Sequence, residues 1–317
     1  MTNYLHLTVK PSFGGHEKFV FRDGWLKKGV DAVSVEPGIF SDDQALVVLG
    51  VGKNMVRSIR HWCLATGVCE ESDGPDRKRS IGVSSFGRQL MIDGGWDPFM
   101  EDSGTLWVLH WQLTENLQRS LVWHLIFGRF YDVEFTKLQL GQFLSRQFER
   151  LGVTTTPGMV AREIDCFVRT YAPTRTNSGK INSGKINEET LECPLTELDL
   201  IRFVPQDNVY RFNIGAKPNL PDAVFAHALL YYIAHIAQHR RTVAVDECVY
   251  GEGSPGQVFR MDENSVVERL ERLTELTSGQ IRLQESAGLN QLYISTEQSS
   301  LLLDTAQRLL EEYYARN

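Results

Sequence analysis

The sequence has few cysteines and no long apolar run. Its 317 residues include five cysteines, and none of them forms a C-x-x-C pair. An odd count at wide spacing favours neither a disulfide framework nor a zinc ribbon, so we expect reduced and mostly buried thiols. The longest apolar stretch, 223–236, contains two histidines and is too short to cross a bilayer of about 30 Å as a helix. The first ten residues have no apolar signal core. We therefore expect a soluble, cytoplasmic protein with no membrane partner.

An excess of positive charge is also missing. Lysine and arginine number 33 against 40 aspartates and glutamates, which gives a net charge of −7. A protein that coats nucleic acid without specificity needs clustered cations to neutralise phosphate, so this class is disfavoured. The total charge does not report on local basic patches, and any contact with DNA has to be local.

The apolar patterns predict a mainly α protein with small β-wings, of the α+β class. A polar tract at 174–190 repeats NSGKI in tandem, and such a tract cannot bury enough apolar surface to offset its ordering entropy. We interpret it as a flexible linker. The predicted domains are therefore an N-terminal winged-helix-like DNA-binding domain at 1–116, a helical middle domain at 117–173, and a C-terminal winged-helix-like helical domain at 191–317.

Helix periodicity and local stop signals place the elements of the two later domains. Apolar spacing predicts a helix at 136–151, and Pro157 suits the first turn of the next helix. After the linker, Asp262 or Asn264 can cap a helix that Gly279 ends. The other predicted elements are a helix at 221–238, a hairpin of 280–283 with 291–294, and a last helix at 300–314. A helix followed by two strands is the order of the back half of a winged helix.

The segment 41–66 is typical of a helix-turn-helix. Ser41 and Gln44 have the spacing of a capping box before a short apolar helix. A turn containing Gly50 follows, and a second helix is predicted at 53–66. Its apolar side chains fall on one side. The opposite side carries the residues that we expect to contact DNA, namely Lys53, Asn54, Arg57, Arg60 and His61.

These residue types suit the major groove of DNA. Lysine and arginine meet phosphates and guanine edges, and asparagine can pair with adenine. The alternative is a solvated basic face on an ordinary helix. A basic triplet lies at a distance from the second helix that suits a wing, where it could contact backbone phosphate. The alternative interpretation of this triplet is a solvated loop. The triplet consists of Arg77, Lys78 and Arg79.

The segment GVGK at 50–53 only partly resembles a phosphate-binding loop. That motif needs G-x-x-x-x-G-K followed by serine or threonine, whose hydroxyl holds magnesium. Val47 stands where the first glycine should be, and Asn54 follows Lys53. We therefore interpret this segment as the turn into the second helix.

Two acidic clusters could hold a divalent metal for phosphodiester chemistry. The candidate catalytic and metal-binding residues are Glu17, Asp97, Glu101 and Asp102, with Mg²⁺ or Mn²⁺ as the cofactor. Neither cluster has a diagnostic nuclease spacing. The alternatives are a turn at Asp97 and helix N-terminal charge at Glu101 and Asp102. His16 and Arg22 are alternative candidates for a phosphate or partner pocket.

Four segments together resemble a known bacterial family. They lie at 13–29, 41–62, 95–111 and 254–273. The chain resembles the DUF4007 family, which accompanies DNA phosphorothioation genes in anti-phage defence systems and includes an SspB-like DNA-nicking subunit. The resemblance implies nicking in support of sulfur insertion. It also implies partners among the phosphorothioation subunits, a sulfurtransferase resembling PAPS reductase and an ATPase. It assigns no active site.

Three functions follow from these observations. The first is a metal-dependent DNA nickase, which the family resemblance and the carboxylates favour. The second is a non-catalytic DNA-recognition scaffold for the modification complex. The third, a helix-turn-helix regulator, is less favoured because no compact sensor domain is evident.

Overall fold

The computed structural model describes residues 9–73, 79–172, 193–237, 240–286, 289–296 and 298–316. The predicted linker at 174–190 lies outside these residues, as do Arg77 and Lys78, while Arg79 is described for its backbone alone. No helix in the described ranges is long and apolar enough to cross a membrane. All five cysteines are free and buried, as expected.

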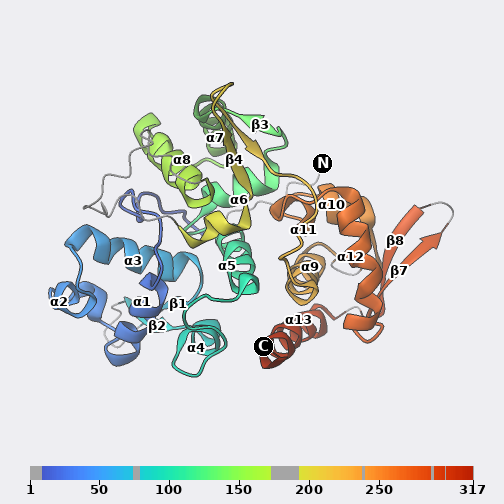
Figure 1. Ribbon diagram of the computed structural model, residues 1–317, viewed down its shortest axis with the longest axis horizontal. Coiled ribbons are helices and arrows are strands. Elements are labelled where there is room, and N and C mark those ends of the chain that lie inside the picture. Colours follow the sequence, from blue (N-terminus) through green and yellow to red (C-terminus); the bar gives the residue numbers. More distant parts are fainter. Residues whose placement is uncertain are drawn as a thin grey trace.

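The N-terminal part consists of short helices followed by a hairpin (Figure 1). In chain order the elements are α1 (Trp25–Val35), η1 (Ile39–Ser41), α2 (Ala45–Leu49), α3 (Lys53–Ala65), β1 (Cys69–Asp73) and β2 (Arg79–Val83). Gly50 ends α2 in the left-handed conformation, with φ 65°, as the predicted turn requires. The predicted capping box at Ser41 is wrong. Ser41 ends η1, and Asp42 Oδ1 accepts the Gln44 N–H at 2.7 Å in a local turn.

Helices dominate the middle of the chain. The elements are α4 (Ser85–Met91), α5 (Ser103–Glu115), α6 (Leu121–Arg129), β3 (Glu134–Phe135), α7 (Lys137–Arg150) and α8 (Pro157–Tyr171). The predicted helices α7 and α8 are confirmed. Thr136 and Gln139 form a capping box at the start of α7, and Pro157 occupies the first turn of α8.

The residues after the undescribed segment 173–192 first rejoin the middle of the chain. They form η4 (Pro194–Leu198), β4 (Ile201–Val204) and β5 (Val209–Phe212). Strand β5 pairs with both β4 and β3, and the rings of Phe135 and Tyr210 stack with centroids 5.6 Å apart. Strand pairing therefore joins residues on both sides of 173–192. The domain boundary predicted at 191 would separate β3 from β4 and β5, which belong to the same sheet.

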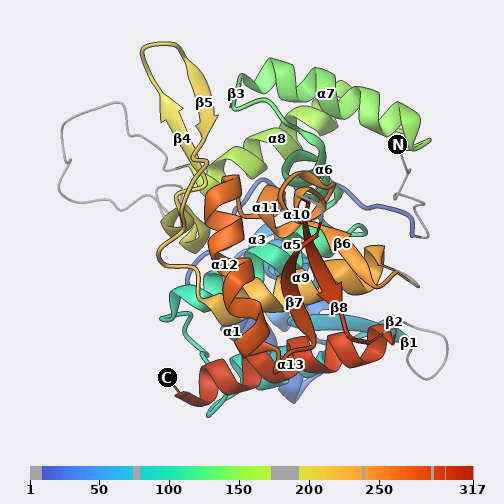
Figure 2. The ribbon, with the colours of Figure 1, turned by 90° about the vertical axis from the view of Figure 1, so that its right-hand side faces the viewer.

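The C-terminal part begins with α9 (Asp222–Ile236) and ends with α13 (Ser299–Arg316), which packs along α9 (Figures 1 and 2). Between them lie β6 (Thr242–Ala244), α10 (Val245–Tyr250), α11 (Pro255–Val258), α12 (Glu263–Leu276), β7 (Ile281–Ser286) and β8 (Leu289–Ile294). Asp262 caps α12, and β7 with β8 forms the predicted hairpin. The sheet order is β6-β8-β7.

One continuous apolar core underlies all of these parts. Its largest side chains are aromatic. Trp62 of α3 meets Trp123 of α6 edge-on, with ring centroids 5.8 Å apart, and both rings are fully buried. Such large rings dominate core energetics because each buries about 150–250 Å². The observed architecture confirms the α+β class, mostly helical with small antiparallel sheets.

Candidate nucleic-acid interface

A loop at residues 13–19 bridges α3 and α8. The Gly14 N–H donates to Glu163 Oε1 of α8 at 2.6 Å. On the other side, the Ser58 hydroxyl of α3 donates to the His16 carbonyl at 2.9 Å. The loop is therefore fixed to both helices.

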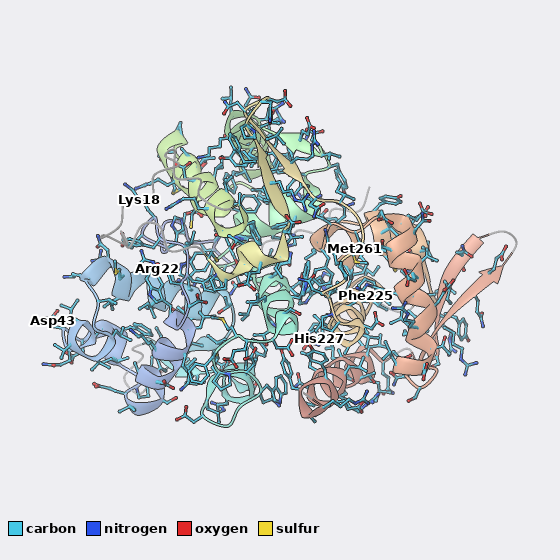
Figure 3. The ribbon with its side chains drawn as sticks, viewed as in Figure 1. Lys18, Arg22, Asp43, Phe225, His227 and Met261 are labelled. Atoms are coloured by element: carbon cyan, nitrogen blue, oxygen red, sulfur yellow. The ribbon has the colours of Figure 1, made fainter. Side chains whose placement is uncertain are left out.

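The turn at Glu17 and Lys18 has an unusual backbone conformation. Both residues have positive φ angles, 48° and 68°, which cost non-glycine residues about 1–3 kcal/mol each. Several hydrogen bonds hold the turn, and two of them involve the backbone of Lys18. The Lys18 N–H donates to His16 Nδ1 at 3.0 Å, and the Arg169 guanidinium of α8 donates to the Lys18 carbonyl. The Lys18 side chain is exposed on this loop (Figure 3).

His16 is buried beside a carboxylate of α8. Its Nε2 lies 3.3 Å from Glu163 Oε1. Burial alone would lower the pKa of His16, but Cys166 and Glu163 beside it raise the pKa to about 10. The His16 ring and the Glu163 carboxylate therefore form a buried pair that anchors the loop to α8.

The predicted phosphate or partner pocket at His16 and Arg22 requires correction. His16 is 1% exposed and Arg22 is 8% exposed. The Arg22 guanidinium lies 5.6 Å from the Phe19 ring centroid and 5.1 Å from that of Trp25. Both side chains are buried, so neither offers an open surface for a ligand.

The exposed face of α3 carries three of the five residues predicted to contact DNA. Lys53, Asn54 and Arg57 are exposed in the first half of the helix. The Arg57 side chain remains 56% exposed although its guanidinium lies 3.3 Å from Glu17 Oε1. We name Lys53, Asn54 and Arg57 the α3 face.

Arg60 pairs with a carboxylate of the hairpin. Its guanidinium lies 2.8 Å from Glu71 Oε1 of β1, and the same oxygen lies 2.7 Å from Arg119. Arg60 is half-buried and connects α3 to the hairpin. The sequence did not single out Glu71 or Arg119, because they approach Arg60 only in the folded chain.

His61 does not lie on the exposed face, which corrects the prediction. The side chain is 5% exposed, and its ring meets those of His16 and Trp62 with centroids 5.8 and 5.1 Å apart. Gly15 lies so close that a Cβ there would be 2.6 Å from His61 Nδ1. The loop at 13–19 covers this side of α3, and burial holds the pKa of His61 well below its usual value.

The second acidic cluster forms the junction between α4 and α5. The two carboxylate oxygens of Asp97 accept the N–H groups of Glu101 and Asp102 at 2.9 and 3.0 Å. Asp102 caps α5, because its Oδ1 accepts the Gly104 N–H at 2.6 Å and the Tyr313 hydroxyl at 2.7 Å. Glu101 is exposed. Two of the three carboxylates therefore organise the loop and its contact with α13.

The first acidic candidate has different surroundings. Glu17 lies on the loop between α3 and α8 and pairs with Arg57, whereas the other three belong to the junction beside α13. In the described ranges, no three histidine, cysteine or acidic side chains gather in a way that could hold a metal ion.

The fold and this surface define a mainly helical α+β protein with an exposed cationic helix face. The protein of unknown function family DUF4007 matches residues 13–314, so the chain belongs to this family. Two solved structures are similar, with a TM-score of 0.84 each. A crystal structure of SspB is 29% identical, and a magnesium-ion-bound crystal structure of SspB is 30% identical. Each comparison covers 96% of this chain and 88% of the other. No curated protein matches. The resemblance to an SspB-like family is thus confirmed.

Proposed function

We propose that this protein is the DNA-binding subunit of a bacterial DNA phosphorothioation and anti-phage system, and that it nicks DNA with Mg²⁺ or Mn²⁺. Membership of the DUF4007 family and the similarity to SspB support the place in such a system. One of the similar SspB structures is magnesium-bound, which supports the choice of cofactor. Other phosphorothioation subunits, including the PAPS-reductase-like sulfurtransferase and the ATPase, are the proposed partners.

The α3 face is the observation that carries the DNA-binding proposal. The order α1, α2, α3, β1, β2 is that of a winged helix, in which α3 would be the recognition helix and β1–β2 the wing. Recognition helices contact bases through their N-terminal residues. Lys53, Asn54 and Arg57 occupy this end of α3, where the helix dipole also favours phosphate.

The C-terminal part has a winged-helix order as well, but its charge is unsuited to DNA. The equivalent helix, α12, carries four glutamates and two arginines. Both arginines are occupied, because the guanidinium groups of Arg269 and Arg272 lie 2.6 and 3.0 Å from Asp222. We therefore propose that the N-terminal part alone reads DNA.

The proposed metal ligands are four carboxylates, and they differ in exposure and in their contacts. Mg²⁺ is commonly bound through one or two carboxylates plus substrate phosphates, so a site completed by DNA needs few protein ligands. Of Glu17, Asp97, Glu101 and Asp102, the exposed Glu101 is the clearest candidate, because the others have the contacts described above.

A plasmid assay tests the nicking proposal. Supercoiled plasmid incubated with the protein and Mg²⁺ or Mn²⁺ should yield open circles, and EDTA should abolish them. Glu101→Gln should lose nicking while keeping DNA affinity. Supercoiled plasmid that stays intact with both metals would reject the nickase.

A non-catalytic scaffold is the second candidate. The use of Asp97 and Asp102 as hydrogen-bond acceptors in their own loop favours it. Salt-sensitive DNA binding without any nicking, in the assay above, would select the scaffold over the nickase.

A further inference from the structure

A cationic hollow lies where the loop at 13–19 meets α7 and α8. It has a volume of about 400 Å³, and its walls come from the loop at residues 13–19, from α7 and from α8. The lining residues are Lys18, Lys137, Arg162, Asp165 and Arg169. Four cations against one carboxylate leave three positive charges in excess, in a concave site large enough for part of a nucleotide.

The contacts within the hollow show which cations are available to a ligand. Lys137 Nζ lies 2.6 Å from Asp165 Oδ1, so this pair neutralises itself. Arg169 donates to the carbonyls of Lys18 and Asp165 and thereby supports the wall. Lys18 and Arg162 are exposed, and in the described part of the chain neither has a carboxylate within 4.0 Å. These two charges are therefore the ones open to an anion.

The hollow and the α3 face are connected by one turn of chain. Glu17 pairs with Arg57 of α3. The next residue, Lys18, lines the hollow, and its backbone carbonyl accepts a hydrogen bond from Arg169 of α8. The buried pair of His16 and Glu163 fixes this turn to α8. The position of Lys18 between α3 and α8 is visible in Figure 3.

We propose that the hollow binds a phosphate of the same DNA backbone that lies on α3, so that the interface extends across Lys18 to Arg162 of α8. This inference rests on the proposed DNA binding. Unpaired lysine and arginine attract phosphate because their binding releases counterions from DNA. A phosphate held on α8 would fix the position of the duplex on α3 without reading its sequence.

The test compares DNA affinity over a series of salt concentrations, by fluorescence anisotropy with a labelled duplex. The hollow variant is Lys18→Asn with Arg162→Gln, in which asparagine tolerates the positive φ at position 18. The matched control, Lys28→Gln with Arg150→Gln, removes two exposed cations from α1 and α7. We expect the hollow variant to bind more weakly, with a slope of log K against log salt that is smaller by about two. The control should bind like the wild type.

The same measurement separates this inference from the proposed function. If the hollow variant keeps the wild-type slope while Lys53→Ala with Arg57→Ala loses affinity, the inference is overturned and α3 alone binds DNA. If none of the variants changes affinity, both are overturned. Inorganic phosphate provides the last arm. If phosphate raises the unfolding temperature of the wild type but not of the hollow variant, while the DNA slopes are equal, the hollow takes a free phosphate compound and not DNA.

Discussion

Arg57 and Arg60 lie one turn apart on α3, and their partners separate them. Arg60 shares Glu71 with Arg119 and connects the helix to a strand, whereas Arg57 keeps most of its side chain in solvent beside Glu17. The same distinction holds among the carboxylates. Asp97 and Asp102 accept backbone N–H groups, and Glu101 faces solvent. Residue type alone therefore does not identify a functional side chain in this protein.

The acidic junction gives a prediction about stability. Asp102→Ala removes the cap of α5 and the acceptor for Tyr313, and it should lower the free energy of unfolding by about 1 kcal/mol. Glu101→Gln should leave that free energy unchanged. Chemical denaturation followed by circular dichroism measures both. Equal stability of Asp102→Ala and wild type would show that this carboxylate is not a structural cap.

The buried pair of His16 and Glu163 gives a prediction about pH. The pKa of His16 is about 10 in the folded protein, against an ordinary value of 6.5. The raised pKa means that its contribution to stability is complete below pH 6.5 and is lost as pH rises to about 10. Glu163→Gln should reduce the loss of stability between pH 6.5 and about pH 10.

Denaturant titrations across that pH range measure the effect. Asp165→Asn is the matched control, since Asp165 lies on the same helix but pairs with Lys137 at the surface. If Glu163→Gln gives the same pH profile as Asp165→Asn and the wild type, the pair of His16 and Glu163 does not contribute to the pH dependence of stability.

At the scale of elements, α3 and α12 each precede a pair of antiparallel strands but differ in charge. The exposed side of α3 carries cations, and α12 carries four glutamates. Glu268→Gln with Glu271→Gln should therefore leave DNA affinity and its salt dependence unchanged, because we place α12 away from DNA. Anisotropy with the duplex used above measures this. Tighter binding with a steeper salt slope would place α12 at the DNA.

The elements that the sequence predicted well are those with local signals. Thr136, Pro157 and Asp262 lie within one turn of the helices they start, so α7, α8 and α12 could be placed from neighbouring residues. The covering of His61 by the loop at 13–19 and the pairing of β3 with β5 depend on residues far apart in the chain. Periodicity within a helix contains no information about such contacts.

The candidate site shows the same limit. The apolar and exposed sides of α3 followed from helical spacing, which correctly placed Lys53, Asn54 and Arg57 in solvent. The hollow could not be predicted from the sequence, because Lys18 and Arg162 are distant in the chain and line one hollow only in the folded protein.

At the scale of the whole molecule, Arg260 connects the C-terminal part to the middle. It is 4% exposed and donates to the carbonyls of Ile126 and Phe130 at 2.8 and 3.2 Å, at the end of α6. Its guanidinium lies 3.8 Å from the ring centroid of Phe212. Burial lowers the pKa of Arg260 to about 9.

Removal of this connection should destabilise the protein as a unit. Arg260→Met removes the guanidinium donor from the Phe130 carbonyl and leaves the Ile126 carbonyl with the Phe130 N–H, and we expect a loss of about 1.5–3 kcal/mol. Arg146→Met, at an exposed position on α7, is the control. Thermal unfolding should remain a single transition, since one core runs through the chain. A separate early transition of the C-terminal part would contradict this view.

The salt dependence of DNA binding shows whether the α3 face contacts phosphate. Anisotropy titrations should compare the wild type with Lys53→Ala plus Arg57→Ala, and with the Lys28→Gln plus Arg150→Gln control. We expect weaker binding by the α3 variant and a salt slope smaller by about two, with the control unchanged. Wild-type affinity and slope in the α3 variant would contradict this expectation and show that this face is only solvated.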